Sequence, residues 1–227
     1  RVSGAGAQCF IVSGPSGSGK TTVVEYLLKY VPRLLFSVSY TTRAPRGGEQ
    51  NGREYHFVQP QEFEQMIARN ELLEYAQVFG QYYGTHRRVL ERATREGKDL
   101  LLDIDVQGAQ QVKSRHPAAV AVLLIPPSAE ELERRLRARG QDAPEVIQRR
   151  LQRAREEIAS YGTYDYLVVN RELGDTCAQV EAIVLTERAT RHGQPPPPKA
   201  AIRAAAARRE ATKSRVSAIL ESFGAHG

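Results

Sequence analysis

The chain has 227 residues, of which 41% are hydrophobic, enough for one large domain or for a core with inserted subdomains. No apolar stretch approaches 18 residues and no signal-peptide pattern opens the sequence, so we expect neither a membrane span nor a secretory signal. The net charge is +6, but residues 191–227 carry seven Lys or Arg against two Glu. The first 190 residues are therefore nearly neutral, which argues against nucleic acid as a partner. Two distant cysteines without a CxxC motif indicate reduced thiols and a cytoplasmic protein.

Continuous apolar runs alternate with helical patterns along most of the chain. Continuous rather than alternating hydrophobicity is typical of parallel strands that are covered on both faces. The predicted strands are 8–13, 99–105, 118–125 and 165–170. The predicted helices are 19–30, 107–115, 128–139, 144–160 and 174–190. This alternation predicts an α/β fold, a parallel sheet core with helices on both faces.

Two regions interrupt the alternation, and a third follows it. Residues 39–91 are rich in Tyr, Gly and turn signals, which indicates a small mixed insertion. Residues 134–155 are crowded with arginine. Consecutive prolines within 194–198 cannot continue a helix and are expected to end the domain, while residues 199–223 have strong helix propensity. We therefore predict a proline break and a basic helical tail over 191–227.

The stretch GPSGSGKT at 14–21 fits the pattern G-x-x-x-x-G-K-[ST] between a predicted strand and a predicted helix. Glycines let backbone N–H groups turn toward phosphate oxygens, and the start of the helix adds its positive end. Lys20 is expected to reach the β and γ phosphates, and the Thr21 hydroxyl to hold Mg²⁺. The predicted ATP-binding residues here are Gly14, Pro15, Ser16, Gly17, Ser18, Gly19, Lys20, Thr21 and Thr22.

Two carboxylates end the apolar run LLLDID. Asp103 and Asp105 stand where a carboxylate near a nucleotide-bound Mg²⁺ is expected, and beside a phosphate loop this interpretation outweighs that of solvated strand-end residues. Asp105 is our candidate second residue of a magnesium site with Thr21.

The insertion carries a candidate anion site and a candidate base site. Arg43 and Arg46 lie three residues apart on a turn-rich segment, and the arginine fork suits bidentate phosphate binding. The tyrosines Tyr55 and Tyr83 offer hydroxyl donors to the same anion. Glu74 is a lone carboxylate between apolar neighbours, and it can accept two parallel N–H bonds, as guanine presents at N1 and the 2-amino group.

Six stretches together resemble the guanylate kinase family: SGPSGSGKTT, SVSYTTRAPRGGEQNGREYHFV, ELLEYAQVFGQYYGT, LLLDIDVQGAQQV, PPSAEELERRLRARGQD and YDYLVVN. The resemblance runs from about residue 8 to about residue 188, and these motifs in this order are highly specific. It implies an ATP-dependent GMP kinase with a core over 8–38, 92–133 and 161–190. It also implies a GMP-binding insertion over 39–91 and a helical lid over 134–160.

The resemblance implies a role for each matching residue. The guanine contacts would be Ser39, Glu74, Thr85 and Asp103. The contacts to the GMP phosphate would be Arg43, Arg46, Tyr55 and Tyr83. The lid or transfer-site arginines would be Arg135, Arg139 and Arg150, and Asn170 would lie near the adenine of ATP. The catalytic set would then be Lys20, Arg46, Arg139 and Arg150.

The lid arginines also have a plainer interpretation as a solvated helix face. We prefer it for Arg134, Arg137, Arg149, Arg153 and Arg155, whereas the family match favours function for Arg139 and Arg150. Direct transfer needs no covalent intermediate, and no nucleophilic Cys or His is placed for one.

Two alternative functions stay open from the sequence. A non-catalytic interaction module is disfavoured because the phosphate-loop and phosphate-binding residues are present. A kinase for another nucleoside monophosphate is disfavoured because adenine offers no N1–H to Glu74. The sequence leaves the oligomeric state undetermined.

Overall fold

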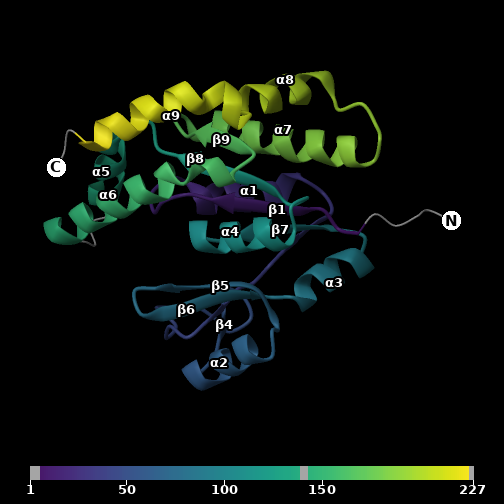
Figure 1. The fold of residues 1–227 in the computed structure, drawn as a ribbon, viewed down its shortest axis with the longest axis vertical. Coiled ribbons are helices and arrows are strands. Elements are labelled where there is room, and N and C mark those ends of the chain that lie inside the picture. The colour runs from purple at the N-terminus through teal and green to yellow at the C-terminus, as the bar shows by residue number, and fades with distance from the viewer. Residues whose placement is uncertain (1–5, 139–142, 225–227) are drawn as a thin grey trace. The chain divides into compact units, whose positions relative to one another are not determined.

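The computed structural model describes residues 6–138 and 143–224, which form a mixed α/β chain (Figure 1). Among these residues, no helix is long and apolar enough to cross a membrane. The strands are β1 (Cys9–Ser13), β2 (Leu34–Phe36), β3 (Tyr40–Thr41), β4 (His56–Phe57), β5 (Leu72–Val78), β6 (Gln81–His86), β7 (Asp99–Asp103), β8 (Val120–Ile125) and β9 (Tyr166–Val169). The helices are α1 (Lys20–Tyr30), α2 (Pro60–Ala68), α3 (Arg88–Arg95), α4 (Val106–Arg115), α5 (Ala129–Ala138), α6 (Pro144–Ala159), the 3₁₀ turn η1 (Tyr161–Thr163), α7 (Leu173–Arg191), α8 (Pro198–Ala207) and α9 (Arg209–Gly224).

The core sheet has five strands in the order β2-β7-β1-β8-β9. The ladders β2–β7 and β8–β9 are parallel, with Leu35 opposite Leu100 and Leu123 opposite Leu167. Every residue of β1 and β8 is buried, as a strand covered on both faces requires. The prediction of a parallel sheet flanked by helices is therefore confirmed.

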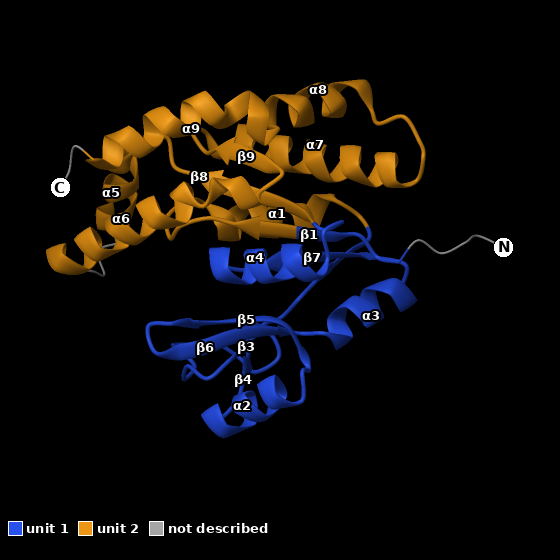
Figure 2. Cartoon of the chain, viewed as in Figure 1, with its two compact units in different colours: residues 1–10, 33–119 blue, residues 11–32, 120–227 orange. Residues whose placement is uncertain are grey.

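Contacts divide the chain into two compact units (Figure 2). Unit 1 comprises Arg1–Phe10 and Arg33–Ala119, and unit 2 comprises Ile11–Pro32 and Val120–Gly227. The predicted division into core, insertion and lid stays a prediction.

Unit 1 contains a second, four-stranded sheet in the order β4-β3-β6-β5. The strands β5 and β6 are antiparallel, and Glu74 pairs with Thr85 across them after a register shift between Leu72 and Glu74. Phe63 and Met66 of α2 pack with Leu72 to form a small apolar cluster of this sheet. The mixed sheet agrees with the small mixed insertion predicted for 39–91, and its apolar cluster was not predicted.

Unit 2 contains the phosphate loop, the helices α5 and α6, and the C-terminal helices. Figure 1 shows α8 running beside α7, and the contacts extend from α9 to α5, α6 and β9. Pro198 begins α8, where its missing N–H costs no helical hydrogen bond. The basic segment is therefore folded onto unit 2 as two helices.

Two arginines at the junction of α8 and α9 attach the tail to β9 and to the residues before it. The guanidinium of Arg208 lies 4.4 Å from the ring centroid of Tyr166 and donates to Glu187. The neighbouring Arg209 donates to the carbonyl oxygens of Gly162 and Tyr164. These contacts place the positive charges of Arg208 and Arg209 on acceptors within unit 2.

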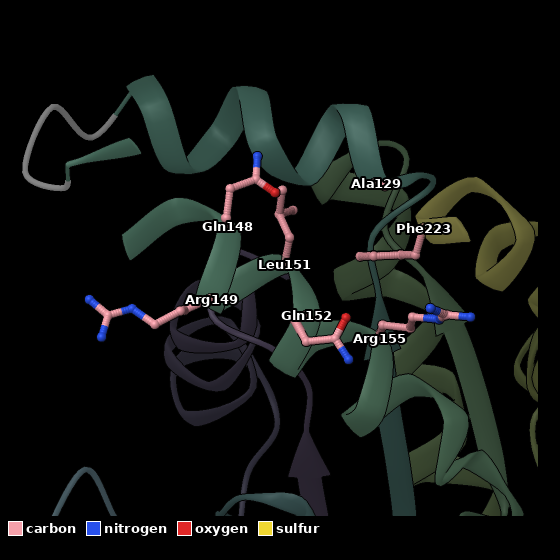
Figure 3. A pocket seen from close by; sticks show the side chains of 7 residues that line it. All are labelled: Ala129, Gln148, Arg149, Leu151, Gln152, Arg155 and Phe223. Carbon is pink, nitrogen blue, oxygen red and sulfur yellow. The ribbon is translucent and has the colours of Figure 1, made fainter. Parts of the chain in front are cut away.

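The far end of α9 packs on the helices α5 and α6. Val216, Ile219 and Phe223 are buried, and the Ser222 hydroxyl accepts a hydrogen bond of 3.0 Å from the N–H of Ala129. Phe223 and Leu151 line a cavity, and Figure 3 shows their side chains. The volume of this cavity is about 350 Å³. Apolar burial on one face of α9 therefore holds the end of the tail.

Replacing Phe223 by Ala should lower the free energy of unfolding by about 3 kcal/mol, because it removes a buried aromatic ring and leaves a cavity. Urea unfolding of the two proteins measures the difference. Ile202→Ala is the matched control, since that side chain is 72% exposed in α8 and its loss should change stability by less than about 0.5 kcal/mol. Equal stability of Phe223→Ala and the parent would show that α9 is not docked.

Candidate active site

The phosphate loop joins β1 to α1 in unit 2. Gly19 precedes α1 with a φ of 91°, a left-handed conformation that a side chain would strain, and a Cβ there would lie 2.4 Å from Asn170 Nδ2. A Cβ on Gly14 would lie 2.5 Å from the Leu124 carbonyl oxygen. The first turn of α1 contains no acidic residue. The loop is thus a bare backbone at a helix N-terminus, which suits an anion.

Ser18 supplies independent support for an anion site in the loop. Its hydroxyl is buried and finds no hydrogen-bond partner among residues 6–138 and 143–224. A buried polar atom without a partner is costly, so native sites keep one mainly where a water, ion or ligand satisfies it. A phosphate oxygen in the loop would satisfy this hydroxyl.

Asn170 holds the loop in place. Its Nδ2 donates to the Ser18 carbonyl at 2.8 Å, and its Oδ1 accepts from the Thr176 hydroxyl at 3.0 Å. Arg135, in turn, donates to the Asn170 carbonyl at 2.9 Å and pairs with Glu131. We predicted ATP contacts for Asn170 and Arg135, and these roles stay predictions. The observed hydrogen bonds link both residues to the supports of the phosphate loop.

Arg150 of α6 reaches the loop, since its Nη1 donates to the Ser16 hydroxyl at 3.2 Å. Arg139 lies outside the described residues. Three other arginines of α5 and α6 pair with glutamates one helical turn away, as a solvated face predicts: Arg134 with Glu131, Arg137 with Glu133 and Arg153 with Glu157. Arg150 therefore differs from these neighbours, because it contacts the phosphate loop at Ser16.

The candidate base site lies in unit 1 between β5 and β6. Glu74 and Thr85 face each other across the two strands, with 3% and 0% of their surfaces exposed. The Thr85 hydroxyl is buried and has no hydrogen-bond partner in the described part of unit 1. A buried carboxylate beside an unused hydroxyl offers acceptors and one donor to a planar polar ligand.

Burial raises the pKa of Glu74 from 4.5 to about 7. The Thr85 side chain lowers this pKa, and the Thr85 N–H and the charge of Arg115 lower it further, whereas the charge of Asp105 adds to the rise. The carboxylate therefore lacks enough donors of its own, and a ligand with two N–H groups would supply them.

Arg43, Tyr55 and Tyr83 come together in unit 1, and their role toward a phosphate stays a prediction. The Arg43 guanidinium lies 5.2 Å from the Tyr55 ring centroid, and the rings of Tyr55 and Tyr83 meet edge to face at 5.9 Å. Hydrogen bonds to the Glu49 carboxylate raise the pKa of Arg43, with both distances at 2.9 Å. Glu49 also accepts from the backbone N–H of Arg46 at 2.7 Å. A phosphate at this cluster would replace Glu49 as the partner of the guanidinium.

The remaining predicted residues of unit 1 are Ser39, Asp103 and Asp105. Ser39 precedes β3 and is half-buried, and Asp103 ends β7. Asp105 is the N-cap of α4, where its Oδ1 accepts from the Gly108 N–H at 2.9 Å. Asp105 thus fixes the start of a helix, and its role toward a metal ion stays a prediction.

Among residues 6–138 and 143–224, no group of three or more His, Cys, Asp or Glu side chains is arranged to hold a metal ion. Mg²⁺ does not require such a group, because it binds nucleotide kinases through one or two protein oxygens, phosphate oxygens and water. A threonine hydroxyl and an aspartate are suitable ligands of this kind. Thr21 belongs to unit 2 and Asp105 to unit 1.

Two residues of these sites were not predicted. Glu49 belongs to a polar turn and carries no pattern of its own, so only folding shows that it pairs with Arg43 six residues earlier. Gly108 lies within a predicted helix, and a glycine inside a helix is the one feature of the sequence that could have drawn attention to it. A Cβ at Gly108 would lie 2.5 Å from Glu74 Oε2.

A bare loop that leads from a buried strand into a helix, carrying Lys20 and Thr21 at its end, defines a P-loop nucleotide-binding protein. The guanylate kinase family model matches residues 6–187. A guanylate kinase of Koribacter versatilis is 50% identical over 220 residues, covering 94% of both chains. One of Shewanella oneidensis is 50% identical over 182 residues, covering 80% of this chain and 88% of its own.

A crystal structure of guanylate kinase from Anaplasma phagocytophilum matches with a TM-score of 0.66 and 35% identity, covering 82% of this chain and 86% of its own. The chain belongs to the guanylate kinase family. It is therefore a kinase, a phosphotransferase, and ATP-dependent phosphorylation of GMP is the activity of the family. Residues 188–227 lie beyond the match to the family model.

The raised pKa of Glu74 makes stability depend on pH. The folded state binds the proton more tightly than the unfolded state, so this group stabilises the fold fully below pH 4.5 and loses that contribution as pH rises to about 7. Glu74→Gln removes this dependence. Urea unfolding without nucleotide should show the variant gaining up to about 3 kcal/mol relative to the parent between pH 5 and pH 8. Parallel pH curves for the two proteins would contradict the burial of an ionisable carboxyl.

Proposed function

We propose that this protein transfers the γ-phosphoryl group of ATP to GMP in one in-line step, yielding ADP and GDP for purine nucleotide metabolism. A phosphate oxygen of GMP forms the new bond to the γ-phosphorus as the bond to the bridging oxygen of ADP breaks. The observation that carries the choice of GMP is the buried pair of Glu74 and Thr85, with the Thr85 hydroxyl unused.

Guanine matches this pair atom by atom. Its N1–H and 2-amino group are adjacent donors for the two oxygens of Glu74, and its O6 accepts from the Thr85 hydroxyl. Ser39 and Asp103 complete the proposed base contacts. Two N–H donors favour the ionised carboxylate, so guanine would also offset the desolvation that raises the pKa of Glu74.

The GMP phosphate is proposed to bind Arg43, Arg46, Tyr55 and Tyr83. Arginine forms bidentate pairs with phosphate as it does with carboxylate, and Arg43 already forms such a pair with Glu49. The phosphate would take the place of Glu49 as the bidentate partner of this guanidinium. The tyrosines add donors and an apolar wall.

The ATP phosphates are proposed to bind residues 14–22, with Lys20 at the transferring group. Phosphoryl transfer relies mainly on positioning and on charge stabilisation, which suits Lys20, Arg46, Arg139 and Arg150. The contact of Arg150 with Ser16 supports a place beside the loop. Helix α6, which carries Arg150, lies within the proposed lid over 134–160.

Thr21 and Asp105 are the residues proposed to hold Mg²⁺ together with the phosphates. A bound Mg²⁺ would supply positive charge that offsets the negative charge of the phosphates. The oxygen donors of both side chains suit this hard cation.

Base selection tests the proposal directly. Wild-type protein should use GMP far better than AMP, by a factor of about 10⁴ in kcat/KM, because AMP leaves the buried Glu74 facing an unprotonated N1. Glu74→Gln should lower kcat/KM for GMP strongly while the KM for ATP stays unchanged. Steady-state ADP release with GMP, AMP, CMP and UMP gives the comparison. Equal use of GMP and AMP by the parent would refute the assignment of the base site.

Replacing Lys20 by Met should abolish turnover in a folded protein. Loss of one charge contact to the transferring phosphoryl group should cost roughly 3–4 kcal/mol of transition-state stabilisation, which is more than a hundredfold in rate. Circular dichroism and the unfolding midpoint establish that the variant is folded. Lys29→Met, at the other end of α1, is the control and should keep normal ADP production. A folded Lys20→Met protein with normal turnover would remove Lys20 from the site.

A further inference from the structure

Gly108 is the third residue of α4, directly beside the carboxylate of Glu74. A Cβ built on Gly108 would lie 2.5 Å from Glu74 Oε2 and 3.1 Å from its Cδ. Gly108 itself is buried, and its N–H donates to Asp105 Oδ1. Because Gly108 has no side chain, the carboxylate of Glu74 can occupy the space beside it.

Backbone conformation does not explain a glycine here. Gly108 is absent from the residues with positive φ, so alanine can adopt the same helical backbone. Glycine inside a helix is less stable than alanine, because it loses more conformational freedom on folding. The Asp105 cap needs only a backbone N–H, which every residue except proline supplies. Two contacts remain as constraints: a Cβ would lie 3.3 Å from the Cβ of Ile104, and much closer to Glu74, whose Oε2 would be 2.5 Å away.

We propose that Gly108 is a positioning residue for guanine recognition, acting through Glu74. This inference rests on the proposed role of Glu74 as the base-binding carboxylate. A methyl group at position 108 would push the carboxylate away by roughly 1 Å to reach an ordinary contact distance, and a misplacement of this size costs on the order of a hundredfold in rate.

The surroundings of Glu74 limit how the carboxylate can respond. The side chain is 3% exposed, and its strand pairs with β6 at Thr85. It cannot turn into solvent without breaking out of the buried site. Its second oxygen and the Thr85 hydroxyl must meet the same flat ligand, so a tilt of one disrupts both contacts.

The test is Gly108→Ala, with Gly174→Ala as the matched control. Gly174 lies in the first turn of α7, and a Cβ there would meet no atom within 4 Å. Gly108→Ala should lower kcat/KM for GMP by about 10- to 100-fold, with a KM for ATP within about twofold of the parent. Any decrease in its unfolding midpoint relative to the parent should be no larger than the decrease seen for Gly174→Ala. Gly174→Ala should match the parent in both substrates.

A double-mutant cycle identifies the contact responsible. Aspartate at position 74 is one methylene shorter and withdraws from position 108. The loss in Glu74→Asp/Gly108→Ala should therefore be smaller than the product of the two single losses. Losses that simply multiply, or an equal rise of the KM values for GMP and ATP, would overturn the proposal.

Comparison with Glu74→Gln separates this inference from the proposed function. If Glu74→Gln impairs the use of GMP but Gly108→Ala does not, the inference about Gly108 is wrong and the assignment of the base site stands. If neither variant changes the use of GMP, then Glu74 does not read guanine, and both fail.

Discussion

The phosphate loop must keep its backbone bare, and the hydrogen bond from Asn170 to Ser18 makes that possible. A loop with three glycines at positive φ has little stiffness of its own, since glycine loses the most conformational freedom on folding. The amide of Asn170 supplies the missing constraint, at a distance of 2.8 Å from the Ser18 carbonyl. Because Thr176 fixes the other end of this amide, the loop is held by the residue that follows β9 and by the first turn of α7.

Unit 1 also contains a site whose structure costs stability, and there the buried group is a negatively charged carboxylate. A carboxylate buried to 3% exposure costs stability when no ligand is bound, and its raised pKa is the measure of that cost. The unused hydroxyl of Thr85 adds a second unsatisfied group. Both units thus contain polar atoms whose partners are expected to come from substrates. Specificity follows because a ligand that fails to pair with these atoms gains little by binding.

The sequence predicted the strands and helices of the core because their apolar runs are long and unbroken. It missed β2, since three residues give no period to recognise. The phosphate loop was predictable because its residues are contiguous and each has a defined physical task. Glu49 and Gly108 were not, since their importance comes from contacts across a turn and between a strand and a helix. Such contacts leave no trace in the spacing of one chain.

The docked tail has a consequence for folding of the chain during its synthesis on the ribosome. The N–H of Ala129 can form its hydrogen bond to Ser222 only after 93 more residues have been synthesised. The carbonyl of Tyr164 can accept from Arg209 only after 45 more residues. At ordinary elongation rates the first of these delays lasts on the order of ten seconds. Throughout that interval the faces of α5, α6 and β9 that α9 later covers are open to water. The nascent chain therefore completes the surroundings of its arginine-bearing helices only when the last helix has emerged.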